Sequence, residues 1–291
     1  MRVTFPCLGY SEHSLDAKRA AVLDAFSALA LASRRTQVAV LTCREVLPLP
    51  PFAALKHLIL STPDPADLPI TYLEHATSLE TMSLGTCGPD FGFYSRRSEE
   101  IDVSSLHALK HVRIDNFVPM WLDVPDGCLL HVLWDVDGVH DSEFEAWARD
   151  MQLLWEGQSM RLGSLQICFQ DEEWHSYNMA ALRTMLTGDQ ELAFISLCSP
   201  ELGNEEQPFF VDPSSCQMLA LAERVRFRCG KACSISVTGM QPKWKDLSID
   251  AAKVNLQVEN TAALVRGLDN FWIDAIAVYG STSLSMMLIN R

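Results

Sequence analysis

The chain has 291 residues, of which 48% are hydrophobic and 21% are charged. This apolar content is sufficient for a sizeable core and excludes an intrinsically disordered chain. The formal net charge of −14 argues against a protein that binds nucleic acid or anionic membranes, because such binding needs clustered Lys and Arg.

The N-terminal residues 1–35 are expected to form a helical cap, with a helix from Ser14 to Ala32. They lack the long apolar stretch of a signal peptide, and no run of 18 residues in the chain is apolar and uncharged. The nine cysteines are scattered without the spacing of a zinc site, which indicates free thiols in a reducing compartment. We therefore expect a cytoplasmic or nuclear protein with no membrane-spanning segment.

From residue 36 onward a block of six residues recurs, with apolar residues at its first, fourth and sixth positions. Its eight copies are 55–60, 79–84, 109–114, 129–134, 162–167, 192–197, 222–227 and 244–249. The alternating apolar positions at the end of each block predict one short strand per copy. A weaker ninth copy is expected to place Val38 and Val40 at the apolar positions of the first strand.

The best copy, Leu79-x-x-Met82-x-Leu84-x-x-Cys87, resembles the consensus of leucine-rich repeat proteins. The stretch 72–79 before it resembles the helix-to-strand connection of the irregular repeats in F-box proteins. The resemblance covers roughly residues 36–275. It implies an α/β solenoid, with a curved parallel sheet on the concave side and short helices and loops on the convex side. Most copies lack the consensus Asn or Cys, and their spacing is irregular.

Helices are predicted between the blocks at 142–158, 178–186 and 261–268, the last with Asn260 as its N-cap. The strand-like pieces after Cys229 are interpreted as a C-terminal cap or as extra convex strands of the solenoid. The alternative is a small separate β-rich unit. Residues 276–291 are expected to add a C-terminal cap strand, which completes a single domain. The alternative to the solenoid is an ordinary α/β domain whose buried strands are rich in Leu.

If the strands stack in register, the residues between the apolar positions line up on the exposed face, because neighbouring strands lie about 4.8 Å apart. Arg224, Arg226 and Arg228 alternate along one strand and are candidates for binding an acidic peptide, a carboxylate or a phosphate. The alternative is a solvated strand whose arginines pair with Asp246 and Asp250 of the next block.

A second candidate surface combines two histidines and two carboxylates on adjacent blocks. Its residues are His111, Arg113, Asp115, His131 and Asp135. Such a patch suits a divalent metal or a pH sensor, but ordinary polar surface is the favoured interpretation. Cys168 and Cys198 also fall beside each other, and we expect them to be free thiols.

The segment Asp135-Val-Asp137-Gly138 follows an apolar run and resembles the first motif of haloacid-dehalogenase-type phosphatases. The resemblance implies that Asp135 attacks phosphorus while Asp137 acts as acid/base beside Mg²⁺. The motif lies in mid-chain, and no convincing pair of aspartates for the metal follows it. A phosphatase is therefore the alternative and not the main expectation.

The main expectation is a non-catalytic scaffold for protein–protein interaction, which binds an unidentified protein partner on the concave face. We expect no catalytic residues, no metal and no cofactor, and a monomeric chain. The style of the repeats implies a substrate-recognition module, although no F-box is found in the sequence. A further alternative is a globular domain of unassigned function.

Overall fold

The computed structural model describes part of the chain. The described residues are 2–4, 35–42, 52–62, 73, 75–86, 100–119, 121–136, 141–157, 161–169, 176–188, 191–203, 208–239, 241–275 and 277–280. The chain divides into two compact units, the first formed by residues 1–91 and 95–130 and the second by residues 92–94 and 131–291. Among the described helices, none is both long and apolar enough to cross a lipid bilayer.

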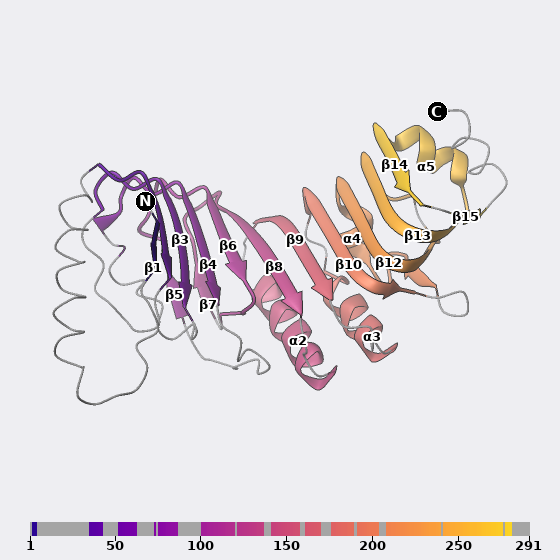
Figure 1. Ribbon diagram of the computed structural model, residues 1–291, viewed down its shortest axis with the longest axis horizontal. Coiled ribbons are helices and arrows are strands. Elements are labelled where there is room, and N and C mark those ends of the chain that lie inside the picture. Colours follow the sequence, from indigo (N-terminus) through magenta and orange to yellow (C-terminus); the bar gives the residue numbers. More distant parts are fainter. Residues whose placement is uncertain are drawn as a thin grey trace. The chain divides into compact units, whose positions relative to one another are not determined.

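The first unit is built on parallel strands that follow one another in chain order (Figure 1). These are β1 (Arg2–Thr4), β2 (Val38–Thr42), β3 (His57–Thr62), β4 (Thr81–Thr86) and β6 (His111–Asp115). Two shorter strands, β5 (Glu100–Asp102) and β7 (Trp121–Asp123), form a separate parallel pair. The expected parallel strands are confirmed for this unit.

The recurring block explains the register of these strands. The apolar residues at its fourth and sixth positions alternate with polar ones, so that each strand buries one face and exposes the other. The buried pairs are Leu58 with Leu60, Met82 with Leu84, and Val112 with Ile114. His57, Thr81 and His111 are partners in register, as the alignment of the blocks predicts.

The predicted ninth copy of the block is wrong by one residue. Ala39 and Leu41 are buried in β2, whereas Val38 is exposed and Val40 is half-exposed. Val40 is instead the register partner of Ile59, which also lies on the exposed face. A shift of one residue exchanges the two faces of a strand. Because consecutive residues around this position are apolar (Ala-Val-Leu), the sequence does not show which of them face the core.

The strands β3, β4 and β6 are also linked to one another just before they begin. The carbonyl of Lys56 accepts a hydrogen bond from the Glu80 amide at 2.8 Å, and the carbonyl of Glu80 accepts one from the Lys110 amide at 2.9 Å. The same residues pair through their side chains, because Glu80 lies between Lys56 at 3.1 Å and Lys110 at 3.0 Å. The two ammonium groups, Lys110 first, lower the pKa of Glu80 from its usual 4.5 to about 2.

The second unit continues the same design with longer strands. Its strands are β8 (Leu129–Val136), β9 (Arg161–Phe169), β10 (Phe194–Leu202), β11 (Phe209–Val211), β12 (Arg224–Val237), β13 (Asp246–Val258), β14 (Asn270–Asp274) and β15 (Ala277–Gly280). The first two residues of β8 belong to the first unit. Neighbouring strands pair in the order β9, β10, β12, β13 and β14, and each of these pairs is parallel.

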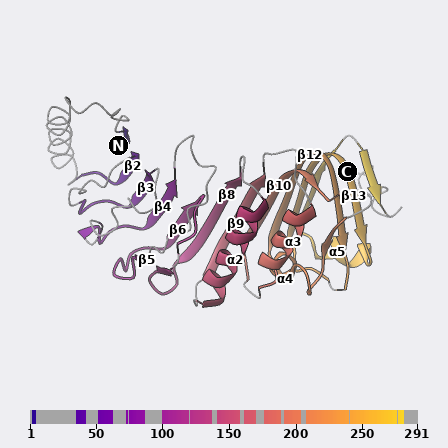
Figure 2. The ribbon, with the colours of Figure 1, turned by 90° about the horizontal axis from the view of Figure 1, so that it is seen from below.

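Helices connect the strands of the second unit and lie over one face of them, as Figure 2 shows for α2 and α3 in front of β9 and β10. They are α2 (Asp141–Gly157), α3 (Ser176–Met185), α4 (Gln217–Leu221) and α5 (Thr261–Gly267). In α2 the spacing of apolar residues places Trp147, Met151 and Leu154 on the buried side. The ring of Trp147 packs on Trp134 of β8, with the ring centroids 4.3 Å apart.

The helices predicted at 142–158, 178–186 and 261–268 are confirmed within one or two residues at each end, whereas α4 is not predicted. Asn260 caps α5, since its side-chain oxygen accepts a hydrogen bond from the Ala263 amide at 3.0 Å. The short strand β11 is not predicted either.

The strand-like pieces after Cys229 belong to the long strands β12 and β13. Both strands continue past a bulge between Cys229 and Ala232, and their second halves pair with β11 on one side and β15 on the other. The second halves bury residues such as Ile235 and Leu256. In the described residues these second halves belong to the same sheet and the same unit as the rest of β12 and β13.

The described residues near each end of the chain form a short strand. Residues 2–4 form β1, which pairs with β2 and extends the sheet where a helical cap was expected. The predicted helix from Ser14 to Ala32 lies outside the described residues. The strand expected within residues 276–291 is present as β15. A single domain over the whole chain stays a prediction.

Candidate binding surface

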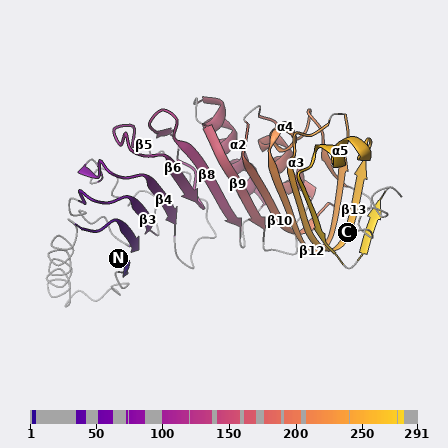
Figure 3. The same cartoon turned by 90° about the horizontal axis from the view of Figure 1, so that it is seen from above.

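One face of the parallel strands β9, β10, β12, β13 and β14 in the second unit is partly open to solvent, and its side chains form three rows across the strands. Those on β12 and β14 are exposed, those on the other strands are half-buried, and Ser164 is buried. Figure 3 shows these strands from the side opposite to Figure 2. The rows are Ser164, Phe194, Arg224, Asp246 and Asn270; Gln166, Ser196, Arg226, Ser248 and Trp272; and Cys168, Cys198, Arg228, Asp250 and Asp274. Parallel sheets are normally covered on both faces, so a partly open face of this extent needs an explanation.

The centre of this face is occupied by Arg224, Arg226 and Arg228, which we call the arginine stripe. All three are exposed on β12, while Val225 and Phe227 between them are buried. The sequence places them on this face because two apolar residues at alternate positions fix the orientation of the strand. The predicted outward orientation of the three arginines is therefore confirmed.

The three arginines differ in their contacts. The Nε of Arg224 donates to the carbonyl of Ala193 at 3.5 Å, and its guanidinium lies 5.6 Å from the centre of the Phe194 ring. Arg228 forms an ion pair with Asp250 at 3.5 Å. Within the described part of the chain, the guanidinium of Arg226 has no hydrogen-bond or ion-pair partner.

The carboxylates of β13 therefore only partly neutralise the stripe. Asp250 is paired with Arg228, as one of the two predicted pairs requires. Asp246 is in register with Arg224, but its oxygen accepts a hydrogen bond from the Asn270 side chain at 2.6 Å. The register partner of Arg226 on β13 is Ser248, and on β10 it is Ser196. Arg226 thus lies between two hydroxyl-bearing residues with no carboxylate beside it in its row.

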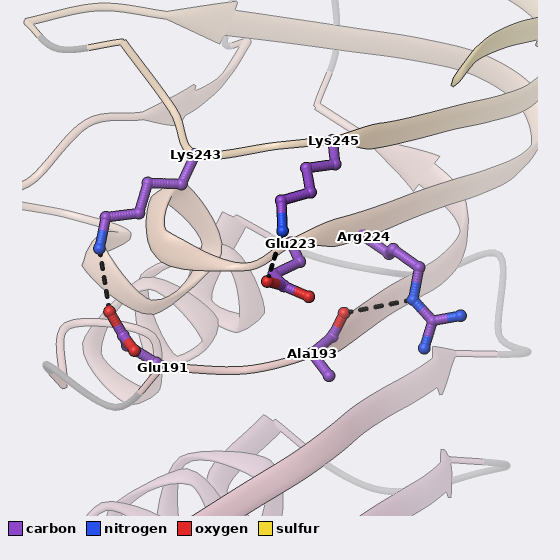
Figure 4. Close-up of polar contacts among 6 residues, drawn as sticks. All are labelled: Glu191, Ala193, Glu223, Arg224, Lys243 and Lys245. Carbon is purple, nitrogen blue, oxygen red and sulfur yellow. Dashed lines mark hydrogen bonds and ion pairs between the residues drawn. The ribbon is translucent and has the colours of Figure 1, made fainter. Parts of the chain in front are cut away.

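Polar contacts at the start of the strands hold this surface in place (Figure 4). Lys245 pairs with Glu223 at 2.8 Å, and Lys243 pairs with Glu191 at 2.9 Å. The Lys245 amide also donates to the Glu223 carbonyl at 2.7 Å. The hydrogen bond to Glu223 raises the pKa of Lys245. This arrangement corresponds to the Lys56–Glu80–Lys110 ladder of the first unit.

The sequence interpretation did not identify Trp272 as part of this face. Trp272 lies in register with Ser248 on β14 and is 50% exposed, which is unusual for an indole. Its strand carries a further copy of the six-residue block, Leu268-x-x-Phe271-x-Ile273, which the sequence interpretation missed. That copy aligns Trp272 with Ser248, which is the register found in the structure. The Lys–Glu contacts were also missed, although the second position of the blocks carries the alternation of charge that produces them.

The residues of the second predicted surface lie in different units. His111, Arg113 and Asp115 lie on β6 in the first unit, where Arg113 pairs with Asp115 of its own strand at 2.6 Å. Ser83 adds a hydrogen bond to the same carboxylate at 3.4 Å. Arg113 and Asp115 therefore largely neutralise each other. A common patch with His131 and Asp135 stays a prediction.

His131 and Asp135 lie on β8 in the second unit. The Nδ1 of His131 is 2.9 Å from the Ser164 hydroxyl, and Asp135 is exposed near the end of the strand. Asp137, the expected acid/base of a phosphatase, lies outside the described residues. Among the described residues, no group of three His, Cys, Asp or Glu side chains is arranged to hold a metal ion.

Comparisons with known proteins add no template for this surface. No family model, no curated protein and no solved structure matches the chain. The surface is therefore interpreted from its own geometry and charge.

Proposed function

We propose that the chain is a solenoid of irregular, leucine-rich-repeat-like units and that it acts as a non-catalytic module for protein–protein interaction. In support, each recurring block supplies one strand, and within each unit the strands that carry a block follow one another in chain order. Repeats of this kind cannot bury their apolar face alone, so stacking forms the core and leaves one strand face for binding.

The proposed ligand is an acidic, extended segment of a partner protein, bound across the arginine stripe. The observation that carries this proposal is Arg226, whose exposed guanidinium lies between two other arginines and has no polar partner in the described residues. A guanidinium binds a carboxylate through two parallel hydrogen bonds, which makes such a position selective for an acidic side chain.

The aspartates on the strands beside the stripe would repel a long acidic ligand, so we expect the acidic part of the ligand to be short. Strands β9 and β10 present Ser, Gln and Cys to the face, whereas β13 and β14 present Asp246, Asp250 and Asp274. An acidic segment is expected to reach the stripe from the neutral side, over β9 and β10. A nucleic acid carries continuous negative charge and would meet the three aspartates and the overall charge of −14.

The aromatic side chains on both sides of the stripe supply apolar contact area. Phe194 lies beneath Arg224 on one side, and Trp272 lies two strands away from Arg226 on the other. Trp, Tyr and Arg are the residues that most often dominate the energy of protein interfaces. We therefore expect bound segments to place an apolar residue near Trp272 in addition to their acidic residues.

Selection from a random peptide display library tests the proposal. The whole chain should enrich peptides rich in Asp and Glu, and Arg226→Glu should weaken their binding about tenfold or more. The matched control is Arg149→Glu, which makes the same charge reversal at an exposed position of helix α2. Enriched peptides without acidic residues, or equal loss of binding in both variants, would contradict the proposal.

A further inference from the structure

Cys168 and Cys198 form a pair of thiols on the exposed face of the second unit. They are register partners on the adjacent parallel strands β9 and β10, and both are free and half-exposed. The other described cysteines, Cys128, Cys216, Cys229 and Cys233, are buried. Among the described thiols, this pair therefore combines a neighbouring partner with access to solvent.

The distance between the two strands permits a covalent bridge. Residues in register on neighbouring strands lie about 4.8 Å apart, within the range of roughly 4.4–6.8 Å between the Cα atoms of disulfide-linked cysteines. Cys198 is also close enough to act on the thiol of Cys168. Burial first, and then this neighbour, raise the pKa of Cys168 to about 12.

We propose that Cys168 and Cys198 are a modification site, at which a low-molecular-weight disulfide such as oxidised glutathione converts the two thiols into a reversible intramolecular disulfide. One cysteine thiolate attacks a sulfur of oxidised glutathione, so that a mixed disulfide forms and one glutathione thiolate leaves. The second cysteine then attacks the mixed disulfide, forms the Cys168–Cys198 bond and releases the second glutathione.

The electrons and protons of this exchange balance. Two cysteine thiols are oxidised, one molecule of oxidised glutathione is reduced to two glutathione thiols, and the two cysteine protons are transferred to them. Because the thiolate is the attacking species and Cys168 holds its proton tightly, we expect the exchange to be slow at neutral pH and faster under mildly alkaline conditions.

The site does not depend on the proposed partner, and its test requires none. The folded whole chain is incubated with excess oxidised glutathione at mildly alkaline pH, free thiols are blocked, and the tryptic peptides are analysed by mass spectrometry. Trypsin cleaves after Arg161, Arg183 and Arg224, so Cys168 and Cys198 fall on the separate peptides 162–183 and 184–224. Fragmentation distinguishes Cys198 from Cys216 on the second peptide.

The expected product is a cross-link between Cys168 and Cys198 that dithiothreitol reverses. In Cys168→Ser and Cys198→Ser this cross-link should be lost, and the remaining cysteine should carry one glutathione. Circular dichroism before and after oxidation shows whether the wild-type chain stays folded. A folded wild-type chain in which both cysteines stay reduced, carry separate glutathiones, or link to other cysteines would overturn the proposal.

Discussion

Arg226 on β12 lies in register with Ser248 on β13, whereas Arg228, two residues further along the same strand, is paired with Asp250. The three arginines of the stripe are therefore not equivalent. Arg228 has a carboxylate partner within the chain, and Arg226 is the arginine best placed to receive one from another molecule. The predictions about binding follow from this difference.

Removing the internal partner of Arg228 should strengthen the binding of acidic peptides. In Asp250→Asn the guanidinium of Arg228 no longer has a carboxylate at 3.5 Å, so a bound peptide meets less competition. We expect a gain in affinity of up to about fivefold, since exposed ion pairs contribute ~0.2–1 kcal/mol. Isothermal titration calorimetry with a selected peptide measures the gain.

The control for this variant is Asp274→Asn, which removes the same charge from the neighbouring strand at the register position of Asp250. It should have a smaller effect, because no ion pair between Asp274 and the stripe is present among the described residues. An equal gain in both variants would mean that the peptide binds better only because the surface carries less negative charge. That result would contradict the idea that Asp250 competes with the peptide for Arg228.

Trp244 is expected to be important for the stability of the second unit. Its indole N–H donates to the carbonyl of Leu219 at 2.7 Å, and the side chain is buried against Phe227. Trp244→Phe leaves this carbonyl without its donor, so we expect a loss of about 1–3 kcal/mol in the free energy of unfolding, measured with urea. The exposed Trp272, changed to Phe, should cost less than about 0.5 kcal/mol. Equal losses would contradict the assigned hydrogen bond.

The stability of the first unit should depend on pH through Glu80. The pKa of Glu80 in the folded chain is about 2, below its usual 4.5, so the folded state binds fewer protons than the unfolded state. The stabilisation is therefore complete above pH ~4.5 and is lost as the pH falls toward ~2.

Melting temperatures of the wild type and Glu80→Gln, measured across this pH range, test the assignment. The difference between the two should be present at neutral pH, shrink as the pH falls from about 4.5 to about 2, and decrease with added salt. A difference that stays constant over the whole range would mean that Glu80 does not stabilise the fold through its charge.

Gly203 should be irreplaceable after β10. Its φ of +70° is unfavourable for other residues, and an added Cβ would lie 2.7 Å from the Phe209 nitrogen and from the Ser234 oxygen. Gly127 is a matched control, because its φ is +80° but nothing lies within 4 Å of the added Cβ. Gly127→Ala should cost about 1–2 kcal/mol and Gly203→Ala clearly more, as thermal unfolding will show. Equal costs would contradict the close backbone approach.

The repeating block predicts much of the fold because it encodes both the strand and its orientation. It aligns Ser164, Phe194, Arg224 and Asp246 across four strands in the register that the structure has. It fails at Val38, where consecutive apolar residues leave the orientation of the strand undetermined. At Trp272 the pattern itself holds, because Leu268-x-x-Phe271-x-Ile273 is a further copy of the block that was not recognised.

Partners within the candidate site were harder to predict than positions. The alignment places Asp246 beside Arg224, yet Asp246 accepts a hydrogen bond from Asn270 and Arg224 lies on Phe194. A side chain on such a face has several neighbours within reach of a hydrogen bond or an ion pair. The sequence does not show which of these neighbours it contacts. The absence of a partner for Arg226 in the described residues could be recognised only from the contacts.

A charge-swap experiment on Arg226 tests the proposed binding mode most directly. The acidic residues of a selected peptide are changed one at a time to Arg, and each peptide is measured against the wild type, Arg226→Glu and Arg149→Glu. We predict that one exchanged position binds the wild type at least about tenfold more weakly and regains affinity for Arg226→Glu but not for Arg149→Glu. If no exchanged peptide regains affinity for Arg226→Glu, Arg226 does not contact an acidic ligand and the proposed binding mode is wrong.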